Sequence, residues 1–293
     1  MLETRGLTRT FGEQRAVDDV SFRVADGALT GFVGGNGAGK TTTMRMIMGI
    51  LAPTAGEVTW HGRPLTREDR ATFGYMSEER GLYPKQPVLQ QLVYLGRLRG
   101  MTTAGAKKVA MEHLERFGLR DRAGDKLESL SLGNQQRVQI AAAVLSEPAV
   151  LILDEPFSGL DPDAVDAMTD LMRDHAARGV PVLFSSHQLD LVERLCDHLV
   201  VLAHGRVVAD GSVADLRHRG RRLHRLVVDR DAGWVRDVGG VSVVDVDGPV
   251  AVLELIEAGA SDRLLTEALR RGSVRELSPI IPSLSEIYRE VTA

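Results

Sequence analysis

The sequence predicts an α/β fold whose central sheet is mainly parallel, and two observations carry that prediction. Residues 150–153 (VLIL) and 181–187 (PVLFSSH) contain unbroken apolar runs, which are typical of parallel strands buried on both faces. Residues 34–41 read GGNGAGKT and lie between an apolar, strand-like run (28–33) and a helix-like run (41–49). That is the spacing and the context of a phosphate-binding loop. The sequence therefore predicts an α/β core organised around bound phosphate.

The phosphate-binding loop indicates its own chemistry. Its glycines let successive backbone N–H groups converge on phosphate oxygens, and the following helix adds the positive end of its dipole. We expect the Lys40 ammonium to reach the β- and γ-phosphates of a nucleotide and the Thr41 hydroxyl to bind Mg²⁺. The predicted phosphate-binding residues are Gly34, Gly35, Asn36, Gly37, Ala38, Gly39, Lys40, Thr41 and Thr42.

Short strands are expected on either side of the loop. Residues 1–27 alternate apolar and polar side chains, as half-buried strands do, and residues 51–62 and 71–79 supply two more strands. Phe11 precedes the loop, where its ring either stacks on a nucleotide base or belongs to the core.

A helical segment interrupts this pattern. Residues 87–100 and 106–118 place apolar side chains at helical spacing, and Gly118 is suited to end the second helix. We predict a helical subdomain at about residues 85–145, inserted into the α/β core.

A second domain is expected after the core. The core ends with a helix at 165–178 and a hairpin that turns at His204-Gly205. Residues 217–225 then form a basic run, which is either a solvated linker or a contact for anionic headgroups beside a membrane partner. We predict domains of residues 1–220 and 221–293.

The second domain is predicted to be small and α+β. Two apolar segments flank Asp247-Gly248, which is a hairpin signal, and residues 261–271 have helical spacing. The segment from Ser283 to Glu286 is typical of the cap of a last helix. The domain has no cluster of ionisable residues at catalytic spacing.

Composition limits the class of protein. The 293 residues are 26% charged and 43% hydrophobic with a formal net charge of −4, so no basic field draws the chain to nucleic acid. The single cysteine, Cys196, excludes an internal disulfide and indicates a small buried side chain in a reducing compartment. No segment approaches the ~18–20 apolar residues of a membrane span, and the N-terminus lacks an apolar signal region. We therefore expect a soluble, cytoplasmic protein.

Acidic and histidine side chains follow two of the predicted buried strands. Asp154 and Glu155 end the strand LILDEP, where Asp154 is expected to hold Mg²⁺ through water and Glu155 to act as a general base. His187 ends the next buried strand, beside the crevice where such sheets bind ligands.

A second phosphate site is predicted where SLGNQQR begins a helix. Ser131, Gly133 and Asn134 bring a hydroxyl and backbone N–H groups to that helix N-terminus. A tight turn, SGLDP at residues 158–162, follows the acidic pair.

These motifs follow one another as they do in the ATPase subunits of ABC transporters, which the sequence resembles over about residues 2–220. Five motifs, GGNGAGKT, SLGNQQR, LILDEP, SGLDP and SSH, agree in order and spacing. The resemblance implies a P-loop NTPase (RecA-like) core that binds ATP and Mg²⁺ and hydrolyses ATP. It also implies a head-to-tail dimer, either of identical subunits or with a second ATPase, in which each phosphate loop faces the partner's signature loop.

The resemblance implies a role for each matching residue. Phe11 would stack on adenine, Asp161 would lie at the dimer seam, and His187 would sense the γ-phosphate. The residues that would bind the γ-phosphate of the partner's ATP are Ser131, Gly133 and Asn134. The catalytic residues would be Lys40, Glu155 and His187, and the metal ligands would be Thr41, Glu78 and Asp154.

Three features depart from the family pattern. The signature is usually LSGGQ; here Leu132 replaces a glycine, which requires a negative φ, and Asn134 shortens an amide side chain. Glu78 stands where the loop that senses Mg²⁺ and the membrane subunit usually carries glutamine, and it adds a negative charge. Gly35 replaces a common proline.

The predicted function is that of an ATP-hydrolysing subunit of an exporter, working with a separately encoded transmembrane permease subunit at the inner face of the cell membrane. The variants EERGLYPK and GNQQR and the C-terminal domain resemble ATPases of exporters for drugs, antibiotics or sodium ions. The alternative is a soluble ABC ATPase that remodels a protein or nucleic-acid complex. Such proteins usually carry two ATPase halves, a long coiled coil or a basic surface, and this sequence has one half and a net negative charge.

Overall fold

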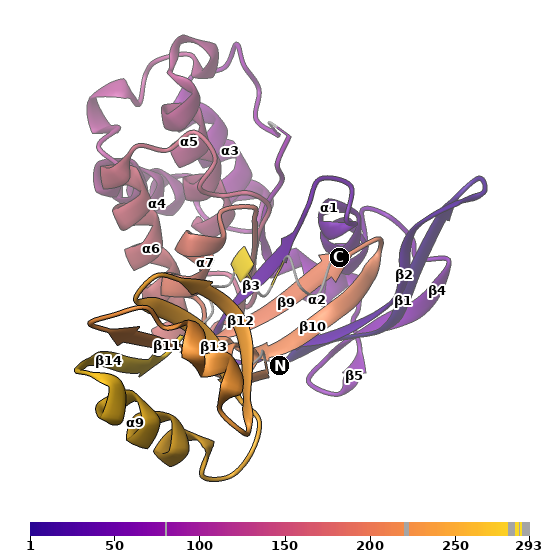
Figure 1. Ribbon diagram of the computed structural model, residues 1–293. Coiled ribbons are helices and arrows are strands. Elements are labelled where there is room, and N and C mark those ends of the chain that lie inside the picture. The colour runs from indigo at the N-terminus through magenta and orange to yellow at the C-terminus, as the bar shows by residue number, and fades with distance from the viewer. Residues whose placement is uncertain (80, 220–222, 281–284, 287, 289–293) are drawn as a thin grey trace. The chain divides into compact units, whose positions relative to one another are not determined.

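The structure is a computed structural model, which describes the chain except for residues 80, 220–222, 281–284, 287 and 289–293 (Figure 1). The chain forms two compact units that divide between Val213 and Ala214. Among the described residues, no helix is both long enough and apolar enough to cross a lipid bilayer.

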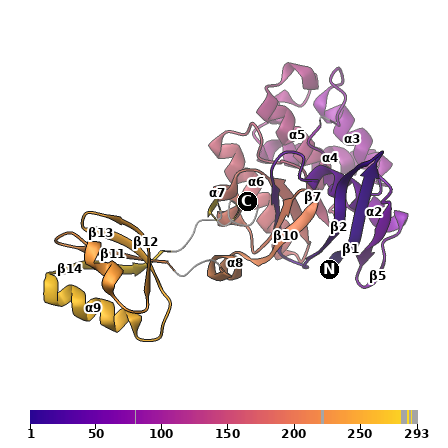
Figure 2. The same ribbon diagram turned by 45° about the vertical axis from the view of Figure 1, so that its right-hand side comes forward.

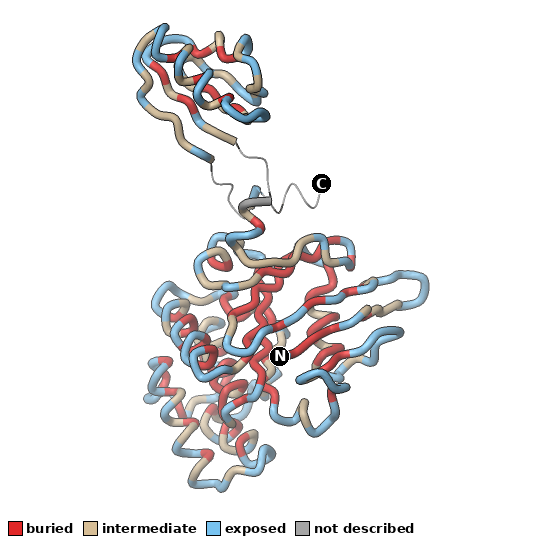
Figure 3. Tube along the Cα trace, turned by 90° about the horizontal axis from the view of Figure 1, so that it is seen from below, coloured by how far each residue is buried: buried red, intermediate tan, exposed pale blue. Residues whose placement is uncertain are grey.

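A six-stranded sheet forms the centre of the first unit. In pairing order its strands are β10 (Arg206–Ser212), β9 (His198–Ala203), β3 (Leu29–Gly34), β8 (Val182–Ser186), β7 (Leu151–Leu153) and β6 (Gly74–Met76). All neighbours pair in parallel except β10, which adds an antiparallel edge. Every residue of β3, β7 and β8 is buried, so the predicted parallel strands covered on both faces are confirmed. Figure 3 shows buried segments gathered in the interior of the first unit.

A smaller antiparallel sheet packs on one face of this central sheet. Its strands, in pairing order, are β2 (Gln14–Val24), β1 (Leu2–Phe11), β4 (Ala55–Trp60) and β5 (Arg63–Pro64). Together with α1 (Lys40–Ile47), the two sheets enclose one apolar core. Within it the rings of Phe22 and Phe32 lie 5.0 Å apart, one from each sheet.

Helices cover the opposite face of the central sheet. α6 (Pro162–Ala177) contacts β3 and β8, and α7 (Leu189–Leu195) contacts β3. A Cβ at Gly31 would lie 2.6 Å from the Cys196 sulfur, so the glycine lets α7 approach the strand closely. Cys196 is therefore packed against β3, and burial raises the pKa of its thiol. The short helix α2 (Arg67–Ala71) precedes β6.

The helices of the predicted subdomain are α3 (Val88–Leu98), α4 (Thr103–Arg116) and α5 (Leu132–Val144), with the 3-10 turns η1 (Arg120–Arg122) and η2 (Leu127–Ser129) between the last two. α3 packs against α4, and both contact α5 (Figures 1 and 2). Gly118 has a φ of 67° just after α4, and the Leu119 N–H donates to the Leu114 carbonyl at 2.7 Å. The predicted glycine cap is therefore confirmed.

Among the residues that the structure describes, the C-terminal unit is an antiparallel sheet with one long helix. α8 (Val213–Arg219) begins at the division between the units. In pairing order the strands are β12 (Val241–Asp247), β13 (Val250–Leu255), β11 (Leu223–Val228) and β14 (Val274–Pro279), and the other elements are η3 (Gly233–Asp237) and α9 (Ala260–Arg271). Leu226 and Leu253 from the sheet and Leu264 from α9 are fully buried in its core. The predicted hairpin at Asp247-Gly248 joins β12 to β13, with Gly248 at φ 51°. The cap predicted to begin at Ser283 lies outside the described residues.

We expect Leu253→Ala to destabilise the C-terminal unit by about 2–4 kcal/mol, because it removes buried methyl groups and leaves a cavity. Since the units are separately compact, scanning calorimetry should show one unfolding transition at lower temperature and the other unchanged. Leu269→Ala, which truncates an exposed leucine of α9, is the control and should leave both transitions in place. An equal shift of both transitions by Leu253→Ala would contradict the division.

Candidate functional site

The phosphate-binding loop joins β3 to α1, and close approaches of its backbone require glycine. A Cβ at Gly34 would lie 2.6 Å from the Leu202 carbonyl oxygen, and one at Gly39 would lie 2.8 Å from that of Ala16. Gly39 also has a φ of 104°, a region that other L-residues rarely adopt. The loop is therefore packed against β9 and β2, directly before the N-terminus of α1, and this arrangement suits an anion.

A cleft of about 350 Å³ lies over this loop. Its lining comes from β2, the loop and α1, the loop after β6, and the turn after β7. The lining residues are Gln14, Ala16, Asn36, Gly37, Ala38, Gly39, Lys40, Thr41, Thr42, Glu78 and Glu155. Residues predicted to bind phosphate, to bind metal and to act as a base therefore share one space.

Lys40 lines this cleft and is held by the loop. Its side chain is 8% exposed, and its Nζ donates to the Gly34 carbonyl at 2.7 Å and to the Gly35 carbonyl at 3.3 Å. The same ammonium lies 3.9 Å from Oε1 of Glu155. Its charge thus lies close to both the loop carbonyls and Glu155.

Glu155 and His187 meet although 32 residues separate them in sequence. Nδ1 of His187 lies 2.9 Å from Oε2 of Glu155. The Glu155 side chain is only 12% exposed, whereas that of His187 is 58% exposed. Glu155 also has a φ of 52°, which is rare for a residue with a long side chain. Three predicted catalytic groups, the histidine, the glutamate and the lysine, are therefore adjacent.

The three predicted metal ligands have donors suited to Mg²⁺. The Thr41 hydroxyl lies 3.4 Å from Oε2 of Glu78, so these two ligands are neighbours. Asp154 is completely buried; its Oδ1 accepts a 2.6 Å hydrogen bond from the Ser185 hydroxyl, and its Oδ2 has no hydrogen-bond partner among the described residues. A buried carboxylate oxygen without a partner is costly unless a cation or a metal-bound water completes it. The residues present therefore fit Mg²⁺.

The signature loop, residues 130–134, does not line this cleft within the single chain. Ser131 caps α5 by accepting a 3.4 Å hydrogen bond from the Asn134 N–H. A Cβ at Gly133 would lie 2.7 Å from the Gly159 carbonyl oxygen, so this glycine lets the loop pack on the SGLDP turn. Leu132 begins α5 in helical conformation, with the expected negative φ, and is 61% exposed.

Asp161 and Phe11 also lie away from the cleft lining. Asp161 caps α6 through the Ala164 N–H at 2.8 Å and accepts two hydrogen bonds from Arg137. Phe11 is 47% exposed, and the Arg9 guanidinium lies 4.7 Å from its ring centroid.

Two further residues, Ser185 and Gln136, form hydrogen bonds with the acidic pair, and the sequence alone assigned no role to either. The Ser185 hydroxyl bridges the acidic pair, since it donates to Asp154 and accepts from the Glu155 N–H at 2.8 Å. Nε2 of Gln136 on α5 donates to the Glu155 carbonyl at 3.0 Å. Both lie inside quoted motifs, SSH and SLGNQQR, but only the folded chain places them against Glu155.

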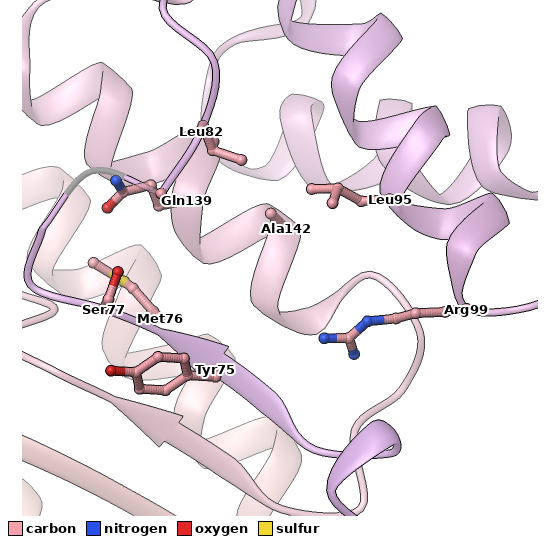
Figure 4. Close-up of a pocket in the computed structure, with 9 residues that line it drawn as sticks. Tyr75, Met76, Ser77, Leu82, Leu95, Arg99, Gln139 and Ala142 are labelled. Carbon is pink, nitrogen blue, oxygen red and sulfur yellow. The ribbon is translucent and has the colours of Figure 1, made fainter. Parts of the chain in front are cut away.

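A second cleft lies beside β6, α3 and α5 (Figure 4). It is lined by Tyr75, Met76, Ser77, Gly81, Leu82, Leu95, Arg99, Gln139 and Ala142. Gln139 is 7% exposed, and its Oε1 finds no hydrogen-bond partner among the described residues. Arg99 donates to the Ser146 hydroxyl at 2.8 Å, and burial lowers the pKa of its guanidinium. The cleft thus combines apolar walls with a cation and a free acceptor.

Comparison with known families covers both units. Residues 17–158 match the ABC transporter family, and residues 211–292 match the C-terminal domain of DrrA1-3-like ATP-binding proteins.

Individual relatives agree over the full length. The chain is 38% identical to the ABC transporter ATP-binding protein YhaQ of Bacillus subtilis (strain 168), over 99% of this chain and 98% of that protein. It is 34% identical to the linearmycin resistance ATP-binding protein LnrL of the same organism, over 100% of this chain and 98% of that protein. Among solved structures, the ATP-binding subunit of an ABC transporter superposes with a TM-score of 0.70 and 34% identity, covering 75% of this chain and 92% of that one. With the geometry of the phosphate-binding cleft, these matches establish that the chain belongs to the ATP-binding subunits of ABC transporters and that it is an ATPase.

Proposed function

We propose that this ATPase is the energy-supplying subunit of an exporter and acts on a separate permease subunit in the membrane. One observation carries the catalytic part: Lys40, Glu155 and His187 meet over a phosphate-binding loop whose cleft also holds Thr41 and Glu78. The similarity to the linearmycin resistance ATP-binding protein LnrL supports export of an antibiotic or drug.

In this proposal each side chain at the cleft has a distinct task. The loop N–H groups and Lys40 bind the phosphates and offset their negative charge. Glu155 accepts a hydrogen bond from the attacking water and orients it for in-line displacement. His187, at 2.9 Å from that carboxylate, orients Glu155 and contacts the γ-phosphate.

Mg²⁺ would be held by Thr41, by Glu78 and, through water, by Asp154. When bound, it would neutralise charge that develops on the phosphate oxygens. Ser185 keeps Asp154 oriented, since its hydroxyl donates to one carboxylate oxygen and leaves the other for the metal shell.

A second copy would complete each site. Ser131, Gly133 and Asn134 lie outside the cleft of their own chain, and Ser131 opens a helix whose N-terminus suits an anion. We propose that these residues bind the γ-phosphate held by the phosphate loop of the partner, with Asp161 at the seam and Phe11 against the adenine.

The permease is proposed to dock at the second cleft. Its walls include Met76 and Ser77, and the next residue, Glu78, lines the nucleotide cleft and lies beside Thr41. A permease segment bound at the end of β6 would therefore lie only one or two residues along the chain from Glu78, a proposed metal ligand.

Glu155→Gln should retain ATP binding and hydrolyse ATP at least about 10²-fold more slowly, because the amide is no longer a base. Binding of a fluorescent ATP analogue and steady-state phosphate release measure the two effects. Glu147→Gln, which changes an exposed glutamate that also has a positive φ (48°), is the matched control. Hydrolysis by Glu155→Gln at near the original rate would remove Glu155 from the mechanism.

Asp154→Asn should raise the Mg²⁺ concentration for half-maximal hydrolysis by about tenfold or more, since it removes the charge of a buried outer ligand. Glu78→Gln should raise it less, because the amide keeps an oxygen ligand at an exposed edge. A magnesium titration of the ATPase rate compares them. An unchanged half-maximal concentration for Asp154→Asn would place the metal elsewhere.

Affinity capture of the tagged protein from gently solubilised native membranes tests the transporter assignment. We expect a polytopic membrane protein in stoichiometric amount, and we expect Ala142→Trp, which fills the second cleft, to reduce its recovery about tenfold or more. Ala104→Trp, at an exposed alanine of α4, should leave recovery unchanged.

Other captures would contradict the proposal in distinguishable ways. Recovery of soluble or ribosomal partners in place of a membrane protein would favour an ATPase that remodels complexes. Full recovery of the permease by Ala142→Trp would leave the exporter assignment standing and would contradict docking of the permease at the second cleft.

A further inference from the structure

Glu155 has a backbone conformation that its own residue type does not favour. Its φ of 52° lies in the left-handed region, where the Cβ of a non-glycine residue crowds the backbone. Such a conformation persists only when surrounding groups hold it.

Two side chains form hydrogen bonds with the backbone N–H and the backbone carbonyl of Glu155. The Glu155 N–H donates to the Ser185 hydroxyl at 2.8 Å, and the Glu155 carbonyl accepts from Nε2 of Gln136 at 3.0 Å. The same Gln136 amide lies 3.4 Å from the Pro156 carbonyl oxygen. Gln136 therefore supplies a donor to two successive carbonyls that both face α5.

The direction of the Glu155 carboxylate depends on these two backbone hydrogen bonds. With the backbone left-handed, Oε2 lies 2.9 Å from Nδ1 of His187 and Oε1 lies 3.9 Å from Nζ of Lys40. Relaxation to a negative φ would swing the side chain away from both groups, because Cβ changes direction with φ.

Gln136 is a cleaner probe of this effect than Ser185. The Ser185 hydroxyl also donates to Asp154 at 2.6 Å, so its loss would disturb the proposed metal ligand as well. Among the described residues, the Gln136 side chain donates only to the carbonyls of Glu155 and Pro156.

We propose that Gln136 is a positioning residue for hydrolysis: its amide keeps Glu155 left-handed and so aims the general base at the attacking water. The inference rests on the proposed role of Glu155. Gln136 lies on α5, the helix whose N-terminus Ser131 caps. The same hydrogen bond therefore also joins α5 to Glu155, the proposed general base of the same chain.

Gln136→Met tests the inference, because methionine keeps the length of the side chain and removes the donor. We expect kcat for ATP hydrolysis to fall about tenfold or more, with KM and ATP affinity within twofold of wild type. Gln91→Met is the matched control: Gln91 is a buried glutamine of α3 that also donates to backbone carbonyls, those of residues 83 and 86. It should leave kcat unchanged.

A double variant separates positioning from a structural role. In a Glu155→Gln background, Gln136→Met should change the residual rate by less than twofold, since there is no longer a base to aim. Multiplicative effects of the two substitutions would overturn the inference, as would an unchanged kcat in Gln136→Met alone.

A structural readout keeps the inference testable without turnover. A crystal structure of Gln136→Met should show Glu155 with a negative φ and its carboxylate more than hydrogen-bond distance from His187. A left-handed Glu155 in that variant would overturn the inference. Hydrolysis by the Glu155→Gln single variant at near the wild-type rate would instead overturn the role of Glu155 as general base, and the crystal structure would still decide what Gln136 holds.

Discussion

The parallel register of β3, β8 and β7 is the constraint on which the nucleotide site depends. Val33 pairs with Ser186, and Phe184 pairs with Leu153, so the three strands end at one edge of the sheet. The phosphate-binding loop, the acidic pair and His187 each follow directly from one of these ends. A slip of one residue would turn buried side chains to the other face and separate these groups. Because both faces are covered, by α1 and the antiparallel sheet on one side and by α6 and α7 on the other, such a slip is strongly disfavoured.

Two features at this edge are unfavourable for folding alone. Asp154 has a buried oxygen without a partner among the described residues, and Glu155 has a left-handed backbone. Strain and unsatisfied polar atoms concentrate at functional sites because a ligand or the reaction makes use of them. Ser185 connects the two features, since one hydroxyl orients the carboxylate of the first residue and binds the backbone of the second. The arrangement therefore links the proposed metal site to the proposed base.

The end of β6 and the residues that follow it relate the two clefts of the first unit. Tyr75, Met76 and Ser77 line the cleft beside α3 and α5, and Glu78 lines the cleft over the phosphate loop. A glutamate at this position carries charge toward Thr41, whereas the usual glutamine of the family would not. A permease that presses on this segment would thus act on a charged residue that we propose as a metal ligand. This gives the proposed coupling a physical route that needs no change in the central sheet.

The sequence was sufficient for everything that depends on local pattern. The spacing of the glycines and Lys40 predicts the phosphate-binding loop, and unbroken apolar runs predict the buried strands. The order of the motifs indicates the family. It also indicated that Asp154, Glu155 and His187 lie near one edge, because parallel strands end together. The contacts of Gln136 and Ser185 with Glu155 were not visible, since 19 and 30 residues separate the partners. Only the packing of α5 and the register of β8 against β7 bring those polar atoms within hydrogen-bond distance, and neither follows from local propensity.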